Sequence, residues 1–461
     1  MAKQRFITDF TEGNVPKQLL RFATPLLLAN LLQAVYNMAD MVIVGRVMGS
    51  VGLSAVSVGG DVSGFLTFLA MGFSNAGQVI ISQYIGAGQR KKVGGFVGTM
   101  FTFLTACSLV LSVICLIFRQ GILRLMNTPA ASWDEALAYS TVCIAGLFFI
   151  YGYNMVSAVL RGMGDSRHPF IFIALAAVMN IVLDIVLVWG LQMGAMGAAI
   201  ATVFSQGFSF VACAIFLWRS RHEMDFEVSF QDFLHPKMEY LSSLTKLGIP
   251  MAIKSASIHF SKLFVNSWIN SYGVAVSAMA GIVNKLGSIC NLISNSVNAA
   301  GSSMVGQNVG AQKYERVPRI MTTCFCFTLC SSALMALAVY LFPELVFGIF
   351  TDEAAVMAIA MEWLPVSVVL FLGSACRSPM NALINGSGNH KVNFATAILD
   401  GIVMRIGLGV LLGLVLHMDY IGFWLGDALA GYTPFFIGLV YYFTGSWKTR
   451  KYVIKEEKAS S

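Results

Sequence analysis

The sequence predicts an all-α polytopic membrane protein with twelve transmembrane helices in two six-helix lobes. Three observations support this fold class. Hydrophobic residues make up 57% of the 461 residues and charged residues only 11%, which is far more apolar than a soluble domain. Apolar runs of about 20 residues, long enough to cross a bilayer as helices, follow one another along the chain. The chain also repeats itself at long range.

Twelve apolar runs, broken by Gly, Pro or charged residues, are the candidate spans. They cover approximately residues 19–44, 53–81, 93–118, 136–160, 169–190, 194–218, 243–271, 276–305, 317–342, 355–385, 392–416 and 420–445. No apolar core followed by a small-residue cleavage site precedes the first run. We therefore expect no removable signal peptide, and we expect the first span to direct insertion.

Lys and Arg are distributed unevenly between the two sets of loops. About 22 of the 30 basic residues lie in the termini and in alternate loops. The opposite loops hold only Arg46, Arg119 and Arg124. Since cytoplasmic loops carry the excess of basic residues, both termini are expected to face the cytoplasm. This bias also explains the net charge of +7, because no compact basic domain points to nucleic acid.

The two halves of the chain resemble each other at three places. LLRFATP, which ends at Pro25, is answered by LTKLGIP, which ends at Pro250. SQYIGAGQ and LRGMGDS are answered by GQNVGAQK and INGSGNH at an offset of about 224 residues. We predict a first lobe over 1–218, a cytoplasmic linker over 219–240, a second lobe over 241–447 and a cytoplasmic tail over 448–461. An even number of spans per repeat gives both lobes the same orientation.

Polar residues in the first lobe lie at matching depths. Asn180 and Asp184 are four residues apart in the fifth span and share one helix face, while Asp40 lies in the first span and Thr202 in the sixth. All four lie within about 15 Å of the outer surface. A carboxylate in a span is costly and marks an ion or proton site by default, although a polar helix-packing pair is the alternative. Two neighbouring carboxylates could share a proton or, with the amide and hydroxyl oxygens, bind Na⁺; the sequence does not choose between them.

The second lobe carries charges of both signs inside its spans. These residues are Lys254, Lys262, Lys285, Arg377, Asp400, Arg405 and Asp427. Asp400 and Arg405 share a span and form either a structural ion pair or part of a substrate site. Lys285 and Arg377 can alternatively extend toward the membrane surface.

Motifs for hydrolysis are absent from the sequence. It contains no GxxxxGK[ST], HExxH or GxSxG pattern. The nine cysteines lie almost wholly in apolar runs at spacings that fit neither a metal site nor a disulfide framework. We therefore expect neither an enzyme nor a bound cofactor, and we expect an ion gradient to supply energy.

These residues resemble the multidrug and toxic compound extrusion (MATE) transporters of the MOP superfamily along essentially the whole chain. The resemblance is carried by TEGNVPKQLLRFATPLLL, YNMADMVIVGRVMGSVGLSAVSVGG, SQYIGAGQ and the second-half copies. Asn180, Asp184 and Asp40 resemble the DinF-like prokaryotic branch. That resemblance implies a coupling-cation site at Asp40, Asn180, Asp184 and Thr202, with Tyr36 and Asn154 in the same cavity.

The same resemblance implies that the first helix bends at Pro25, although Pro25 also fits an ordinary early-helix proline. The chain departs from the NorM-like branch, because span seven offers Lys254, Ser257, His259 and Lys262 where that branch has an acidic residue. Asp400 resembles that branch's second-lobe acid, but its partner is missing, so we expect no Na⁺ site in the second lobe. The superfamily also includes lipid-linked oligosaccharide flippases, which need cationic partners for a diphosphate.

We therefore expect a membrane antiporter that exports amphipathic, cationic, drug-like compounds in exchange for H⁺ or Na⁺, with a lipid-linked oligosaccharide flippase as the alternative. A single chain supplies both lobes, so it is expected to work as a monomer among membrane lipids, without nucleic acid. The expected substrate cavity contains six residues: Tyr36, Asn154, Lys254, His259, Asp400 and Arg405.

Overall fold

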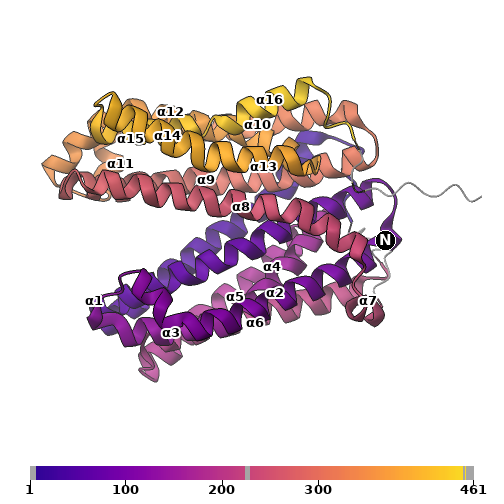
Figure 1. Cartoon of the computed structure of the whole chain (residues 1–461), viewed down its shortest axis with the longest axis horizontal. Coiled ribbons are helices and arrows are strands. Elements are labelled where there is room, and N and C mark those ends of the chain that lie inside the picture. The colour runs from indigo at the N-terminus through magenta and orange to yellow at the C-terminus, as the bar shows by residue number, and fades with distance from the viewer. Residues whose placement is uncertain (1–6, 224–228, 450–451, 453–461) are drawn as a thin grey trace, which may run out of the picture. The chain divides into compact units, whose positions relative to one another are not determined.

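The computed structural model describes residues 7–223, 229–449 and 452 (Figure 1). Parts of the predicted linker and tail, and the basic residues Lys3 and Arg5, lie outside these residues. Within the described residues, all regular secondary structure is helical. The chain divides into two compact units: one contains Thr24–Gly248, and the other contains Asp9–Ala23 and the described chain from Ile249 onward. The predicted lobe boundaries at 218 and 241 stay a prediction.

The helices of the first half are interrupted by short 3₁₀ and π segments. They are α1 (Val15–Gly86), α2 (Arg90–Leu125), η1 (Ala130–Ser132), α3 (Trp133–Ala145), α4 (Leu147–Gly162), α5 (Arg167–Asp184), η2 (Ile185–Gly190), α6 (Gly194–Ser220) and α7 (Phe230–Leu234).

The second half repeats this arrangement. It comprises α8 (Met238–Asn270), α9 (Val274–Gly310), η3 (Tyr314–Arg316), α10 (Val317–Leu341), α11 (Pro343–Gly348), α12 (Ala354–Gly386), α13 (His390–Ile398), η4 (Leu399–Met404), α14 (Arg405–Val410), η5 (Leu411–Val415), α15 (Asp419–Ala430) and α16 (Thr433–Phe443).

Nine helices among the described residues are long and apolar enough to cross a membrane. One of them, α1, has 72 residues and contains the first two predicted spans, joined at Gly49, where φ is +64°. The pair Ala130–Ala145 and Leu147–Gly162 is bent by 49° and forms a further candidate span. Helix α8 is not among the nine. Each predicted apolar run consists mainly of helical residues. The count of twelve spans stays a prediction.

The repeat is also visible in the backbone. Gln192 and His417 have φ of +52° and +51°, and Gly194 and Asp419 have φ of +63° and +51°. Each pair is 225 residues apart and follows a π-helical segment, η2 in the first half and η5 in the second. Positive φ is uncommon for residues with a side chain, so these matched turns fix the register of the two halves in this region.

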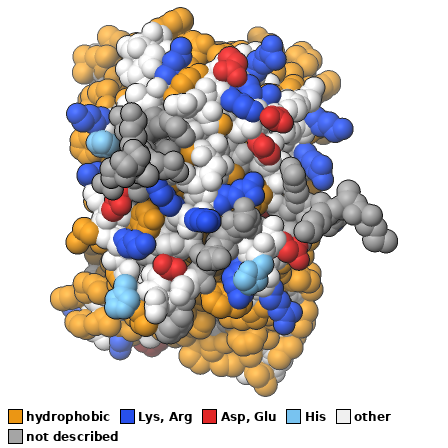
Figure 2. All heavy atoms as spheres, turned by 90° about the vertical axis from the view of Figure 1, so that its right-hand side faces the viewer, with side chains coloured by type: hydrophobic (Ala, Val, Ile, Leu, Met, Phe, Trp, Pro, Cys, Tyr) orange, Lys and Arg blue, Asp and Glu red, His pale blue; other side chains and the backbone are white. Residues whose placement is uncertain are grey.

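Charged side chains are frequent in the view of the surface that Figure 2 shows. On the face shown in Figure 2, Lys and Arg side chains lie among a few Asp and Glu side chains, and hydrophobic side chains border them. A charged surface bordered by apolar side chains is typical of a protein end that leaves the bilayer.

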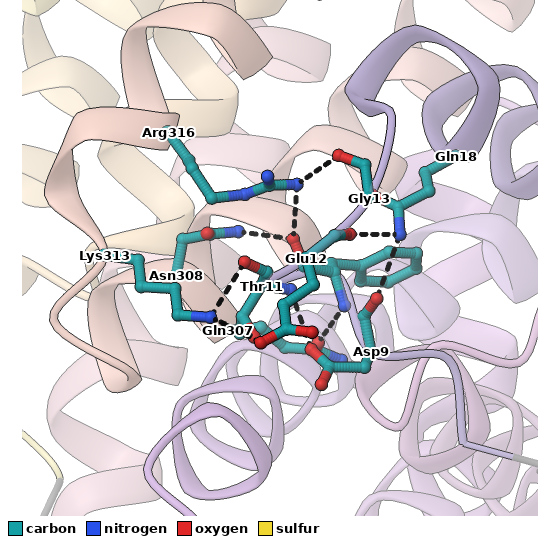
Figure 3. A network of polar contacts seen from close by, with 10 residues as sticks. Asp9, Thr11, Glu12, Gly13, Gln18, Gln307, Asn308, Lys313 and Arg316 are labelled. Atoms are coloured by element: carbon teal, nitrogen blue, oxygen red, sulfur yellow. Dashed lines mark hydrogen bonds and ion pairs between the residues drawn. The ribbon is translucent and has the colours of Figure 1, made fainter.

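The segment before α1 belongs to the second unit. Phe10 is fully buried, and its N–H donates to Gln307 Oε1 at 2.9 Å. Its carbonyl accepts from Asn308 Nδ2 at 3.0 Å and from Arg316 Nη2 at 3.2 Å (Figure 3). Helix α1 thus starts in the second unit and continues from Thr24 in the first.

Candidate functional site

Three helices of the first unit carry the predicted ion-binding side chains. Asp40 lies in α1, Asn180 and Asp184 lie in α5, and Thr202 lies in α6. Asp184 is the last residue of α5, immediately before the π-helix η2. The i→i+5 bonds of a π segment widen the helix locally, and such segments are frequent at functional sites. The exposed fractions of Asp40, Asn180 and Asp184 are only 6%, 1% and 0%.

The structure brings these side chains together in pairs. The Asp40 and Asp184 carboxyl groups lie near enough for their charges to interact. Asn180 Nδ2 donates to Thr202 Oγ1 at 3.5 Å, which is a long hydrogen bond. Asn180 and Thr202 also line one pocket with Tyr36. Residues that the sequence placed at equal depth therefore lie near one another in the structure.

Several oxygen atoms at this site are buried and have no protein hydrogen-bond donor among the described residues. They are Asp40 Oδ1, Asn180 Oδ1 and both carboxyl oxygens of Asp184. A buried carboxylate without a partner is strongly disfavoured, and two adjacent carboxylates also repel each other. A shared proton would remove one charge and make the hydrogen bond between them. The same oxygen atoms also fit Na⁺, which binds carboxylate and amide oxygens.

The surroundings of the site include polar residues that the sequence did not single out. Tyr36 OH accepts from Gln33 Nε2 at 3.3 Å and from Gln206 Nε2 at 3.2 Å. Tyr139 and Cys143 lie within electrostatic range of Asp40. Gln33 could have been found from sequence, because it lies three residues before Tyr36 on the face that carries Asp40. Tyr139 and Cys143 come from another helix, so only packing reveals them.

Asn154 lies in α4, where its Nδ2 donates to the carbonyl of Ile150 in the same helix at 2.8 Å. The residues that line the Tyr36 pocket do not include Asn154. Its predicted place in the cavity stays a prediction.

In the second unit, Arg405 is the centre of a buried ion cluster. Its exposed fraction is 2%, and its Nη2 donates to Asp400 Oδ1 at 3.0 Å. Its Nη1 donates to Asp427 Oδ1. The predicted pair of Asp400 and Arg405 therefore exists, with Asp427 as a second acceptor.

A pocket beside this cluster is lined by Lys262, Arg377, Arg405 and Asp427 and contains about 520 Å³ of space, including its opening. Arg377 Nη2 donates to Asn291 Oδ1 at 2.6 Å. Lys254 Nζ donates to Asn381 Oδ1 at 2.6 Å.

His259 is exposed on α8 and is not among the residues that line this pocket. Of the residues predicted for the substrate cavity in this half, only Arg405 lines the pocket directly, while Asp400 lies behind it as its ion-pair partner.

Comparisons with known proteins agree with this architecture. The chain is 28% identical over 443 residues to the "Probable multidrug resistance protein YpnP" of Bacillus subtilis, covering 96% of this chain and 98% of that protein. It is 25% identical to the "Probable multidrug resistance protein NorM" of Thermotoga maritima, covering 96% and 95%. The fold matches a MOP superfamily transporter from Pyrococcus furiosus, described as having a binding pocket of reverse polarity, with a TM-score of 0.85, 21% identity and coverage of 97% and 100%.

The MatE family model matches the chain twice, over residues 25–186 and over residues 250–411. The two matches start 225 residues apart, the same separation as the matched turns after η2 and η5. Because the two matches together cover well over half of the sequence, the chain belongs to the MatE family.

Proposed function

We propose that this chain is a secondary antiporter that exports amphipathic, cationic organic compounds across the bacterial cytoplasmic membrane in exchange for H⁺ or Na⁺. The observation that carries the proposal is the burial of two interacting carboxyl groups, Asp40 and Asp184, whose buried oxygens and the Asn180 amide oxygen have no hydrogen-bond partner among the described residues. Membership of the MatE family and the names of the relatives in Bacillus subtilis and Thermotoga maritima support the export of drugs.

In the proposed cycle, the coupling cation enters from outside and binds Asp40 and Asp184. Binding favours a rearrangement of the first lobe that releases cargo outward, and release of the cation inside resets the carrier. Coupling requires that cation and cargo favour different conformations, because a ligand that binds both equally shifts neither. The carrier needs no cofactor, forms no covalent intermediate and works as a monomer.

The proposed orientation places both termini in the cytoplasm. The excess of Lys and Arg in the termini and alternate loops supports it, as does the charged face in Figure 2. Under this orientation Asp40 and Asp184 are reached from the outer side.

The test uses purified protein in proteoliposomes loaded with a fluorescent lipophilic cation. Wild type should expel the dye under an imposed proton gradient or sodium gradient, and Asp40→Asn should reduce gradient-driven efflux to the protein-free leak. Asp61→Asn is the matched control, since Asp61 lies in the same helix but is exposed. Efflux by Asp40→Asn at the wild-type rate would contradict the proposal, and the gradient that drives wild-type efflux would identify the ion.

The basic pocket of the second unit favours a second candidate, a flippase for lipid-linked oligosaccharides. Lys262, Arg377 and Arg405 line that pocket, and a lipid diphosphate needs cationic partners. In that case, replacing Lys254, Lys262 and Arg405 should abolish lipid translocation, while Asp40→Asn should leave it intact.

A further inference from the structure

The two halves of the chain place different residues at equivalent positions. The matched turns after η2 and η5 are 225 residues apart. With this offset, Asn180 corresponds to Arg405 and Thr202 corresponds to Asp427. In each half the two residues are 22 positions apart and are hydrogen-bonded to each other. The polar pair of the first half therefore has a charged counterpart in the second half.

This exchange changes what the second half can bind. Where the first half has the Asn180 amide, the second half has a guanidinium that bonds both Asp400 and Asp427. Asp40 and Asp184 correspond to Val265 and Gly409, which carry no charge. Arg405 thus supplies a cation at the position equivalent to Asn180. The net formal charge of the four equivalent positions therefore changes from −2 in the first half to 0 in the second.

The second unit also has more basic than acidic side chains around the pocket. Lys254, Lys262, Arg377 and Arg405 are the cations, and Asp400 and Asp427 are the two carboxylates that lie among them. Lys254 and Arg377 donate to the neutral side chains of Asn381 and Asn291, so these bonds cancel no charge. Net charge inside a membrane span is costly without a partner and marks a functional site by default.

The pocket also has the lining of a site for an acidic group. The space available to the centre of a water-sized group is about 50 Å³, so the pocket accommodates an acidic headgroup, with the rest of the molecule at the opening. Val283 and Leu370 offer apolar surface beside the Lys262 and Arg377 side chains. Arg405 Nε is buried without a hydrogen-bond partner among the described residues. An oxyanion attached to an apolar group would satisfy these features together.

We propose that this pocket binds an oxyanion, the carboxylate or phosphate group of an amphipathic compound. The proposal rests on the proposed export function and deepens it, because the cargo would then include amphiphiles of net negative charge as well as cationic ones. Lys262 and Arg377 provide the unpaired positive charge, while Arg405 keeps Asp400 and Asp427 from repelling the anion.

The test is equilibrium binding of two dyes to the full-length protein in detergent, without any ion gradient. The probes are fluorescein, an anion, and a cationic rhodamine ester with the same xanthene skeleton. Lys262→Gln and Arg377→Gln should each weaken fluorescein binding about tenfold, because each removes one charge-assisted hydrogen bond. Binding of the rhodamine should change by less than about twofold.

Lys285→Gln is the matched control, since Lys285 is exposed on α9 one residue after the pocket residue Asn284. It should leave fluorescein binding unchanged. Thermal unfolding in detergent checks that each variant is folded, and Lys262→Gln alone suffices if Arg377→Gln does not fold. Equal binding by wild type and Lys262→Gln, or an equal loss in Lys285→Gln, would overturn the proposal.

Two further arms separate the sources of the oxyanion. Nanodiscs of phosphatidylcholine with phosphatidylglycerol should block fluorescein binding if lipid headgroups occupy the pocket, whereas nanodiscs of phosphatidylcholine alone should not. Equal binding in both nanodiscs assigns the pocket to cargo. The proposed antiport fails separately, because Asp40→Asn can keep normal efflux of the cation while wild type still binds fluorescein through Lys262.

Discussion

At the scale of single residues, Arg405 takes the position that Asn180 has in the first half, and its two carboxylate partners depend on it. Arg405→Asn should destabilise the protein by about 3–5 kcal/mol, because Asp400 and Asp427 lose their counterion inside a span. The double variant Arg405→Asn/Asp427→Thr recreates the Asn180–Thr202 pair and removes one of the two carboxylates. It should recover part of the loss in thermal unfolding.

Asp427→Thr alone is the control, since Arg405 then keeps its bond to the fully buried Asp400. A double variant whose destabilisation equals the sum of the two single losses would show that Arg405 and Asp427 act independently.

The positions of polar residues along the spans predict how deep each residue lies in the membrane. They were enough to place four residues at the same depth: Asp40, Asn180, Asp184 and Thr202. Depth does not give the direction of a side chain around the helix. The place of Asn154 in the cavity came from the family resemblance and stays a prediction; its described hydrogen bond is to its own helix. Lys262 was noted only as a charge in a span, because its place in a pocket depends on how the helices of the second unit pack.

At the scale of helices, α7 lies against α2 at a glycine. A Cβ added at Gly98 would meet the carbonyl oxygen of Asp232 at 2.6 Å. Thr102 Oγ1 also donates to the carbonyl of Phe233 at 2.6 Å. Gly98→Ala should therefore displace α7 at a cost of about 1–3 kcal/mol, which makes local opening at least about fivefold more frequent.

The measurement is the rate of trypsin cleavage between α6 and α8 in detergent, which should rise in Gly98→Ala. Gly121→Ala is the matched control in the same helix, since a Cβ there meets nothing within 4 Å. Equal cleavage rates in the two variants would show that α7 does not depend on this contact.

Apolar runs predicted where the helices lie, because hydrophobic length sets a span. They did not predict how helices are interrupted. Residues around Gly49 were expected to form a loop, yet helix continues through them with a break at one glycine of positive φ. The π segments η2, η4 and η5 have no composition signal, since a single inserted residue in a turn leaves the apolar pattern almost unchanged.

At the scale of the whole molecule, the first helix of each half passes from one compact unit into the other. Helix α1 leaves the second unit after Ala23, and α8 leaves the first unit after Gly248. Pro25 and Pro250 follow these positions by two residues each. The repeat seen in sequence therefore predicted two equivalent prolines, but only the packing shows that each marks a crossing between units.

These crossings predict that both prolines serve the transport cycle. A proline inside a helix costs about 3 kcal/mol, because it removes a backbone hydrogen bond and its ring meets the preceding turn. This cost destabilises the straight helix, so it lowers the barrier to a rearrangement that bends the helix there. With about half of the 3 kcal/mol acting on the barrier, Pro25→Ala and Pro250→Ala should each slow dye efflux about tenfold. The double variant should be slower by about a hundredfold, since independent contributions to a barrier add. Dye affinity, measured in detergent, should stay at the wild-type value in all three variants. Slowing by Pro25→Ala alone, with Pro250→Ala at the wild-type rate, would restrict the hinge to α1 and leave the second crossing with a structural role.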